Sequence, residues 1–201
     1  MIDANVIPKY CKRYVAFDYG FDMLALLLVA KDTEGNLYVE RELCVPGLTL
    51  GEAGERIAKF LADVRVEYAV ASPDLWNRRQ DSGKSGFEIM QSVFGMPPMI
   101  PADDRRVAGW RVLKEYLSLR EGKPKLYICR NCQTLINSMQ NLLCDKNRAE
   151  DAANEPHSIT HSPEALRYAV MSRMGYVVAH EEKLPFTFAK KKTTIEKYLE
   201  Y

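Results

Sequence analysis

The stretch RYVAFDYG at residues 13–20 decides the architecture of this chain, because an apolar run there leads directly into an acid and a glycine turn. A short apolar run of this kind predicts a buried strand over residues 13–18. A continuous apolar run at residues 23–30 and a segment rich in Leu, Tyr and Val at residues 37–44 follow after short connections. Strands joined by short turns pair antiparallel, so these three segments predict an antiparallel meander.

Beyond the meander, helices alternate with short strands. Apolar residues at helical spacing predict helices over residues 49–64 (or 51–64), 86–94, 105–120, 131–144 and 163–174. Short apolar runs predict two further strands, at residues 68–72 and 125–129. This order implies an α/β domain with a mixed sheet of five or more strands and helices on both faces. It is the element order of an RNase H-like domain, in which the first strand is central and the fourth lies parallel beside it.

The composition is that of an ordinary globular protein. With 201 residues, the chain is long enough for one domain with a sizeable core. We expect an N-terminal tail or linker remnant at residues 1–12, the domain at residues 13–180 and a basic C-terminal tail at residues 181–201. The sequence shows neither a membrane span of roughly 20 apolar residues nor a signal peptide, which predicts a cytoplasmic protein without membrane partners.

The five cysteines do not suggest a disulfide framework, because their number is odd. Cys129 and Cys132 form a C-x-x-C pattern, which is typical of some metal and redox sites, but no second ligand pair lies at a suitable spacing for zinc. Reduced structural thiols are therefore the favoured interpretation. A thiol or zinc protein built on this pair stays open as a weaker alternative.

Three carboxylates lie at junctions between predicted elements. Asp18 ends the first strand, Asp74 follows the strand at residues 68–72, and Glu164 opens the last helix. The carboxyl ends of adjacent parallel strands share one edge of a sheet, so Asp18 and Asp74 are expected to be neighbours. Acids at the ends of buried strands are costly to desolvate, and divalent metal ions are the usual compensation.

Such an acid trio suits phosphodiester hydrolysis. Two Mg²⁺ or Mn²⁺ ions about 4 Å apart can activate a water and stabilise the leaving oxygen. Asp18 would bridge both ions, Asp74 would hold one and Glu164 the other. Each acid also has an ordinary interpretation as a turn, cap or helix-dipole residue, and Glu164 follows a proline at an expected helix start. Only their joint placement favours the metal site.

Other polar residues are candidates for supporting roles. His161 lies one helical turn before Glu164 and could contact a phosphate or assist a metal-bound water, although a capping or surface role is an equal alternative. Asp151 is a possible additional acid, with a solvated loop as the ordinary interpretation.

Several basic residues near Asp74 could bind a nucleic-acid backbone. Arg78 and Arg79 precede a polar loop that contains Lys84, and this loop lacks the pattern of a nucleotide-binding phosphate loop. A cluster of basic residues is more often a solvated surface than a binding site, so these three stay additional candidates.

In three places the sequence resembles the nuclease domain of phage terminase large subunits. The stretch YVAFDYG at residues 14–20 resembles the first acidic motif of that family, and ASPDLW at residues 71–76, which runs into GKSG at residues 83–86, resembles the second. The stretch DAANEPHSITHSPEALRY at residues 151–168 resembles the third motif, in which a histidine, two residues, an acid and Ala-Leu-Arg-Tyr recur together.

The resemblance implies an RNase H-like endonuclease that cuts concatemeric double-stranded DNA during viral genome packaging, with two Mg²⁺ or Mn²⁺ ions. It places Asp18, Asp74 and Glu164 on the metal-binding acids of the family and His161 on the nearby histidine. The third acid is Glu where the family usually has Asp. The implied partners are DNA, the terminase ATPase domain, the small terminase subunit and the portal.

Two further expectations follow. No Walker A motif precedes the predicted nuclease, so the chain is expected to correspond to the C-terminal half of a terminase and not to translocate DNA alone. The alternatives left open are another RNase H-like nuclease, such as a junction resolvase or ribonuclease, and a non-catalytic nucleic-acid-binding module.

Overall fold

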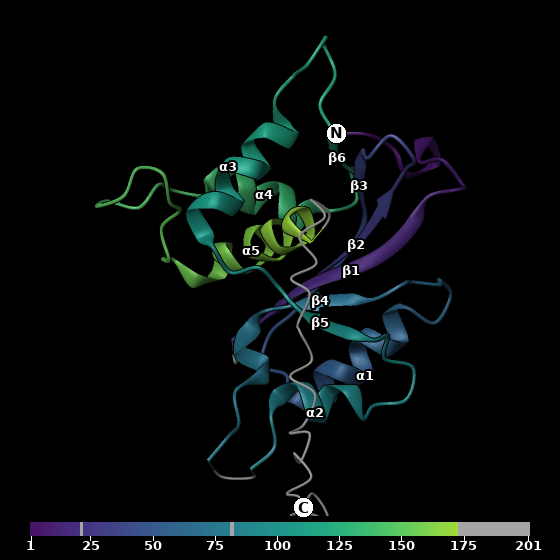
Figure 1. Cartoon of the computed structure of the whole chain (residues 1–201), viewed down its shortest axis with the longest axis vertical. Helices are drawn as coiled ribbons and strands as arrows, with labels where there is room; N and C mark the ends of the chain where they lie inside the picture. Colours follow the sequence, from purple (N-terminus) through teal and green to yellow (C-terminus); the bar gives the residue numbers. More distant parts are fainter. Residues whose placement is uncertain (21, 81–82, 173–201) are drawn as a thin grey trace, which may run out of the picture.

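Strand β1 lies in the middle of a mixed sheet, as the sequence predicts. The computed structural model describes residues 1–20, 22–80 and 83–172, and in these residues six strands pair in the order β5-β4-β1-β2-β3-β6 (Figure 1). The strands are β1 (Lys12–Tyr19), β2 (Leu24–Lys31), β3 (Leu37–Val45), β4 (Ala69–Ala71), β5 (Met99–Pro101) and β6 (Leu126–Ile128).

The predicted meander is confirmed. Strand β1 pairs antiparallel with β2, and β2 pairs antiparallel with β3, with an irregularity in register between Leu28 and Val29. Every residue of β2 except Lys31 is buried, which explains why its sequence is a continuous apolar run instead of an alternating one.

The parallel pairing of β4 with β1 is also as predicted, and it matters most for the site. Phe17 of β1 pairs with Ala71 of β4, so the two strands end at the same edge of the sheet. Strand β5, which continues the sheet beyond β4, was not predicted. It is only three residues long and is flanked by prolines, so it gives no periodic signal.

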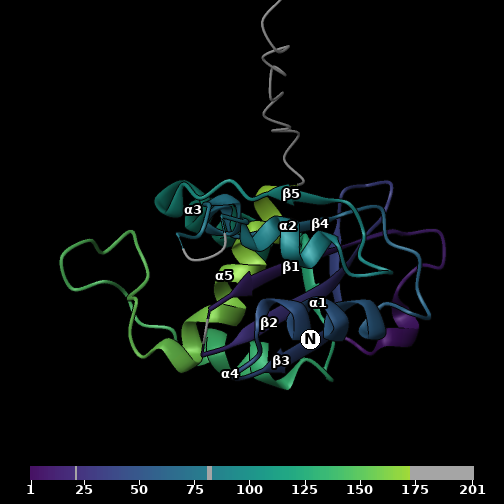
Figure 2. The same cartoon turned by 90° about the horizontal axis from the view of Figure 1, so that it is seen from below.

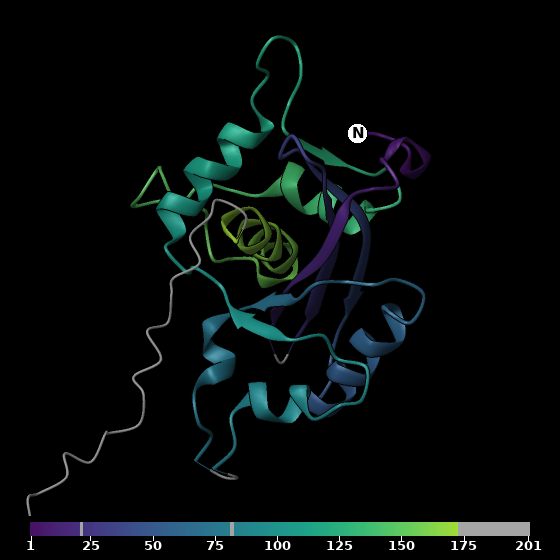
Figure 3. The ribbon, with the colours of Figure 1, turned by 45° about the vertical axis from the view of Figure 1, so that its right-hand side comes forward.

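Helices cover both faces of the sheet (Figures 1 and 3). Helices α1 (Leu50–Phe60) and α2 (Gly86–Gln91) pack on the face that Val15 and Phe17 of β1 contribute to. Tyr14 and Ala16 point to the opposite face. That face is covered by α3 (Arg106–Leu117), α4 (Gln133–Asn141) and α5 (His157–Met171). The period of two along β1 thus supplies alternate residues to two cores.

Helix α5 begins earlier than predicted. It starts at His157, so Pro163 lies inside the helix and Glu164 in its middle rather than in its first turn. The proline misled the prediction, because proline is common at the first position of a helix. All residues of α5 from Thr160 to Met171 are buried, and the Tyr14 hydroxyl donates a 2.9 Å hydrogen bond to the Ala169 carbonyl.

The first residues of the chain contact the domain. Ile2 forms a β-bridge with Cys129, and Ile7 and Cys11 are buried. The expected domain boundaries stay a prediction, and residues 181–201 lie outside the described part of the chain. Figure 2 shows the segment between α4 and α5, in green, extending away from the sheet. None of the described helices combines the length and the apolar character that crossing a membrane requires.

Candidate active site

Two of the predicted acids lie at the edge where β1 and β4 end. Asp18 is the residue after Phe17 in β1, and Asp74 lies in a short 3₁₀ segment, Pro73–Trp76, that follows β4 almost directly. Asp74 is exposed, and no side-chain hydrogen bond or ion pair joins it to another described residue. The register therefore places both acids on one edge, with Asp74 facing solvent.

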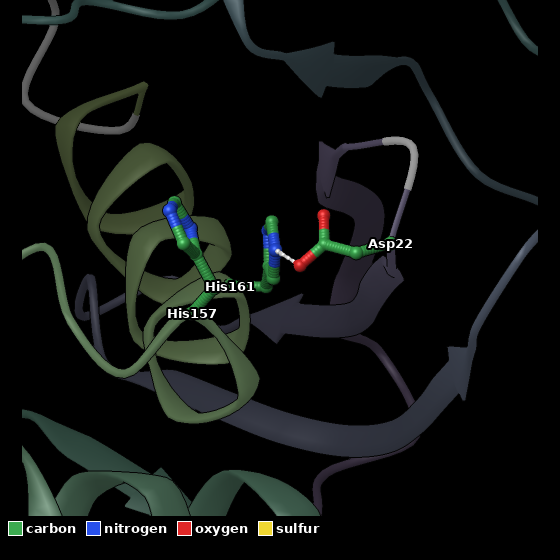
Figure 4. A group of neighbouring side chains, drawn as sticks. All are labelled: Asp22, His157 and His161. Atoms are coloured by element: carbon green, nitrogen blue, oxygen red, sulfur yellow. Dashed lines mark hydrogen bonds and ion pairs between the residues drawn. The ribbon is translucent and has the colours of Figure 1, made fainter.

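His161 of α5 lies between Asp18 and a second aspartate, Asp22. Its Nδ1 is 2.7 Å from Oδ2 of Asp18. Its Nε2 is 3.1 Å from Oδ2 of Asp22, the contact marked by the dashed line in Figure 4. Gly20 lies beneath this contact. A Cβ at Gly20 would lie 2.7 Å from Oδ1 of Asp22 and 2.9 Å from Cε1 of His161, so a glycine is needed for the ring and the carboxylate to approach.

The electrostatics of this group favour a charged imidazole. The hydrogen bond to Asp18 raises the pKa of His161 to about 9, burial opposes the rise, and the hydrogen bond to Asp22 adds to it. The same contact with His161 lowers the pKa of Asp22. At neutral pH an imidazolium thus bridges two carboxylates.

Glu164 is buried and is held by two arginines. Arg106 of α3 donates to Oε1 of Glu164, and Arg167 of α5 donates to Oε2 through Nε at 2.7 Å. The Arg167 side chain is only 1% exposed, and it lies close against Gly109 of α3, where a Cβ would come within 2.7 Å of its Cγ. Both carboxylate oxygens of Glu164 therefore have a guanidinium partner.

Asp151 belongs to the same network and not to a solvated loop. It accepts from Arg106 Nε at 3.1 Å and from Trp110 Nε1 at 3.0 Å. The carbonyl of Ala152 accepts a further bond from Arg106 at 2.9 Å. Arg106 therefore joins Asp151 to Glu164, and the indole of Trp110 serves as a hydrogen-bond donor.

The three additional basic candidates lie on a hairpin after Asp74. Arg79 donates from its backbone to the Lys84 carbonyl at 3.1 Å, and Arg78 forms a β-bridge with Ser85. Burial raises the pKa of the Tyr19 phenol, and the charge of Arg79 opposes that rise, which puts Arg79 near the end of β1.

Two clusters thus contain half of the predicted site residues. Asp18, Asp22 and His161 form one, and Glu164, Arg106, Asp151 and Arg167 form the other. They meet on α5, because His161 and Glu164 are three residues apart on one helical face. Tyr168 lies within electrostatic range of one acid from each cluster. Burial raises its pKa to about 12, and the charges of Asp18 and Glu164 add to the rise.

Asp22, Arg106 and Arg167 were not among the predicted site residues. A sequence signal existed for Arg167, which belongs to the ALRY stretch, and for Asp22, which follows Asp18 in the same turn. Arg106 had only its place in a basic pair to distinguish it.

The cysteines do not form a metal site among the described residues. Cys129 and Cys132 are buried and free, and burial raises the pKa of their thiols to about 11 and about 12. In the described chain, the side chains whose ligand atoms gather closely enough for a metal ion are those of Asp22, His157 and His161.

Comparison of the sequence with protein-family models and with curated proteins identifies no related protein. No protein-family model matches the chain, and no curated protein does either. The fold, however, matches solved structures. The ADP-bound large terminase of a thermophilic bacteriophage superposes with a TM-score of 0.66 and 21% identity, over 84% of this chain and 41% of that one.

Isolated nuclease domains match over most of their own length. The large terminase nuclease domain of bacteriophage SPP1, solved with bound Mn, gives a TM-score of 0.59 and 16% identity, over 84% of this chain and 93% of that one. The large terminase nuclease of thermophilic phage G20c gives 0.55 and 14%, over 83% of this chain and 84% of that one. The resemblance read from the motifs is thereby confirmed in three dimensions: the chain has the RNase H-like fold of large terminase nuclease domains.

Proposed function

We propose that this chain is a metal-dependent endonuclease that cuts concatemeric double-stranded DNA as the nuclease of a viral packaging terminase. The observation that carries the proposal is the gathering of acids around α5 at the carboxyl edge of β1 and β4. Asp18 contacts His161 of α5, Glu164 lies three residues further along that helix, and Asp74 follows β4 at the edge where β1 ends.

The donor chemistry fits hard divalent cations. Asp18, Asp74 and Glu164 offer carboxylate oxygens, which are the ligands that Mg²⁺ and Mn²⁺ prefer. Two of the three acids are already compensated by protein cations, His161 for Asp18 and the arginines for Glu164. These protein cations supply the positive charge that the metal ions would bring, so an ion that binds here would take their place beside the acids. Asp18 would contact both ions, Asp74 one and Glu164 the other.

When bound, two such ions supply an activated water and stabilise the leaving oxygen of the phosphodiester. The chain's own residues position the reactants. His161 is oriented by Asp18 and Asp22, and it can hold or release a proton beside the scissile phosphate. Arg78, Arg79 and Lys84 on the neighbouring hairpin would neutralise backbone phosphates, so DNA affinity should fall as salt rises.

The wider setting follows from the same proposal. A packaging nuclease acts in the host cytoplasm together with the terminase ATPase domain, the small terminase subunit and the portal. The present chain matches the ADP-bound large terminase over only 41% of that protein's length, so these partners are part of the proposal.

Plasmid cleavage tests the proposal. Wild-type protein should nick and linearise supercoiled DNA with Mg²⁺ or Mn²⁺ and not with EDTA, and Asp18→Asn and Asp74→Asn should abolish cleavage. Asp63→Asn is the matched control, because Asp63 is exposed and pairs with Arg41 at the surface. Full cleavage activity in both site variants would contradict the assignment of Asp18 and Asp74 as metal ligands. Binding without cleavage under any metal would favour the non-catalytic module, and four-way junction and RNA–DNA hybrid substrates separate the other nucleases.

A further inference from the structure

The N-terminal end of α5 places two histidines and an aspartate around one point. His157 and His161 are four residues apart, so both side chains lie on the same face of the helix. Asp22 reaches them from the turn between β1 and β2. One ligand atom of each side chain lies within 4.8 Å of those of the other two, and Figure 4 shows Asp22 and His161 facing each other beside His157.

We propose that Asp22, His157 and His161 bind a divalent transition-metal ion of the zinc type. Its donors are distinct from the acids proposed to hold the nuclease ions. Two imidazole nitrogens and one carboxylate suit zinc and its neighbours in the transition series, whereas Mg²⁺ prefers oxygen alone. Three protein ligands leave the fourth tetrahedral position for water. The site stands whether or not the chain cleaves DNA, although an ion on Nε2 of His161 would replace the proton that this nitrogen holds in the proposed nuclease.

The geometry is close to what such an ion needs. Nε2 of His161 and Oδ2 of Asp22 are 3.1 Å apart. Two ligand atoms about 2.0–2.2 Å from a tetrahedral zinc ion stand roughly 3.3–3.6 Å apart, so this pair needs only a small displacement. His157 is an exposed side chain at the first residue of the helix, which leaves it free to rotate toward the ion.

The neighbouring groups already orient the ligands. Asp18 holds Nδ1 of His161, which directs Nε2 toward Asp22. A carboxylate on the far nitrogen of a histidine is the usual support for a metal-binding imidazole. Glu155 lies 3.1 Å from Nε2 of His157 and adds negative charge. The positive end of the α5 dipole opposes a cation at this point, but three carboxylates surround it.

Direct zinc binding to the full chain, first stripped with EDTA, tests the proposal. Isothermal titration with Zn²⁺ in the presence of excess Mg²⁺ should reveal one site. His157→Gln and Asp22→Asn should each weaken it by at least about tenfold. His157→Gln should keep the wild-type melting temperature, because its side chain is exposed. Asp22→Asn removes a partner of His161 and should melt at a slightly lower temperature, while its circular dichroism spectrum should stay that of the wild type. Cys144→Ser and His180→Gln are the matched controls, since they remove an exposed thiol and a histidine outside the described residues, and neither should change the affinity.

Cobalt provides the independent readout. Co²⁺ bound at this site should show tetrahedral nitrogen and oxygen ligation without a thiolate charge-transfer band. Zinc binding that survives both His157→Gln and Asp22→Asn, or a cobalt spectrum with thiolate ligands, would overturn the site. A wild-type chain that binds zinc as expected but cleaves no plasmid would instead contradict the proposed nuclease function and leave the zinc site standing.

Discussion

The two halves of the candidate site compensate the negative charge of their carboxylates with different cations. Around His161, an imidazolium lies between Asp18 and Asp22. Around Glu164, the guanidinium groups of Arg106 and Arg167 compensate the carboxylate. The first cation can be removed by losing a proton, whereas an arginine stays charged at any accessible pH. A metal ion can therefore replace the first by deprotonation, but it can reach Glu164 only if a guanidinium moves.

The halves differ in the burial of one outer partner. His161 and Glu164 are each 10% exposed, but the Asp22 side chain that contacts His161 is 55% exposed on a turn, while the Arg167 side chain that contacts Glu164 is 1% exposed. Substitutions around Glu164, the buried half, should therefore lower the unfolding free energy strongly. Substitutions around Asp22, the exposed half, should lower it less, because the turn can move. The predictions below address this difference, from the largest expected effect to the smallest.

Removing the charge of Glu164 should have the largest effect. In Glu164→Gln the buried Arg167 keeps its charge and loses its carboxylate partner, and breaking a buried pair in this way costs about 3–5 kcal/mol of unfolding free energy. Chemical denaturation measures the change. Glu150→Gln is the matched control, because Glu150 pairs with Arg111 at the surface and should change stability by less than about 1 kcal/mol. Equal effects of the two substitutions would show that the buried pair of Glu164 and Arg167 contributes no more to stability than a surface ion pair.

In the half around His161, the unfolding free energy should depend on pH. The folded pKa of His161, about 9, lies above the ordinary value of 6.5, so its stabilising effect is complete below pH 6.5 and is lost as pH rises through 9. The loss should be at most about 3 kcal/mol. Unfolding free energies at both ends of this range, with an NMR titration of the imidazole, measure it.

Asp22→Asn removes one acceptor of His161 and should therefore lower the folded pKa of the imidazole and reduce the pH dependence. A pKa for His161 at or below 6.5 in the wild-type protein would contradict the bridging imidazolium.

Each half of the site lies against a glycine, which permits a direct comparison. Gly109→Ala should cost about 1–3 kcal/mol, because the new Cβ would lie 2.7 Å from Cγ of the buried Arg167. Gly20→Ala should cost less, since Asp22 can move with its exposed turn. Gly51→Ala is the control: no atom lies within 4 Å of its Cβ, and α1 should gain up to about 1 kcal/mol. Chemical denaturation gives the unfolding free energy of each of the three variants. A larger loss for Gly20→Ala than for Gly109→Ala would contradict the proposed ranking.

The smallest predicted free-energy change is in metal affinity, and Arg106 should control it. Arg106→Gln removes one of the cations that compete for Glu164, so Mn²⁺ should bind more tightly by about tenfold, which corresponds to about 1.4 kcal/mol. Isothermal titration with Mn²⁺ measures this directly. Arg111→Gln changes an exposed arginine on the same helix and should leave the affinity unchanged. Weaker Mn²⁺ binding by Arg106→Gln would show that Arg106 supports the metal centre instead of opposing it.

Much of the fold was accessible from the sequence, because it rests on local patterns. The meander, the parallel pairing of β4 with β1 and the helices on both faces follow from apolar periodicity and short connections. Strand β5 was missed because it takes its place through its parallel pairing with β4 and not through its own pattern. The start of α5 was misplaced because Pro163 resembles a first-turn residue and is tolerated inside a helix packed on all sides.

The site was accessible only in part. Asp18, Asp74, His161 and Glu164 stand out through their positions in motifs, and their proposed roles stay predictions. The partners that decide the state of these residues come from distant elements: Arg106 reaches Glu164 across 58 positions of the chain, and Asp18 reaches His161 across 143. No spacing rule links such positions, so a sequence pattern can nominate the acids but cannot reveal which cations compensate them.

The hydrogen bond from Tyr14 to Ala169 has a consequence for the whole edge. It fixes the height and rotation of α5 against β1 at a point about two helical turns, or roughly 12 Å, from His161. The positions of His161 and Glu164 therefore depend on the same contact. A shift of the helix along its axis would displace the imidazole and the Glu164 carboxylate together. The alignment of the whole edge thus depends on a buried phenol whose contact with α5 lies about two helical turns away from His161.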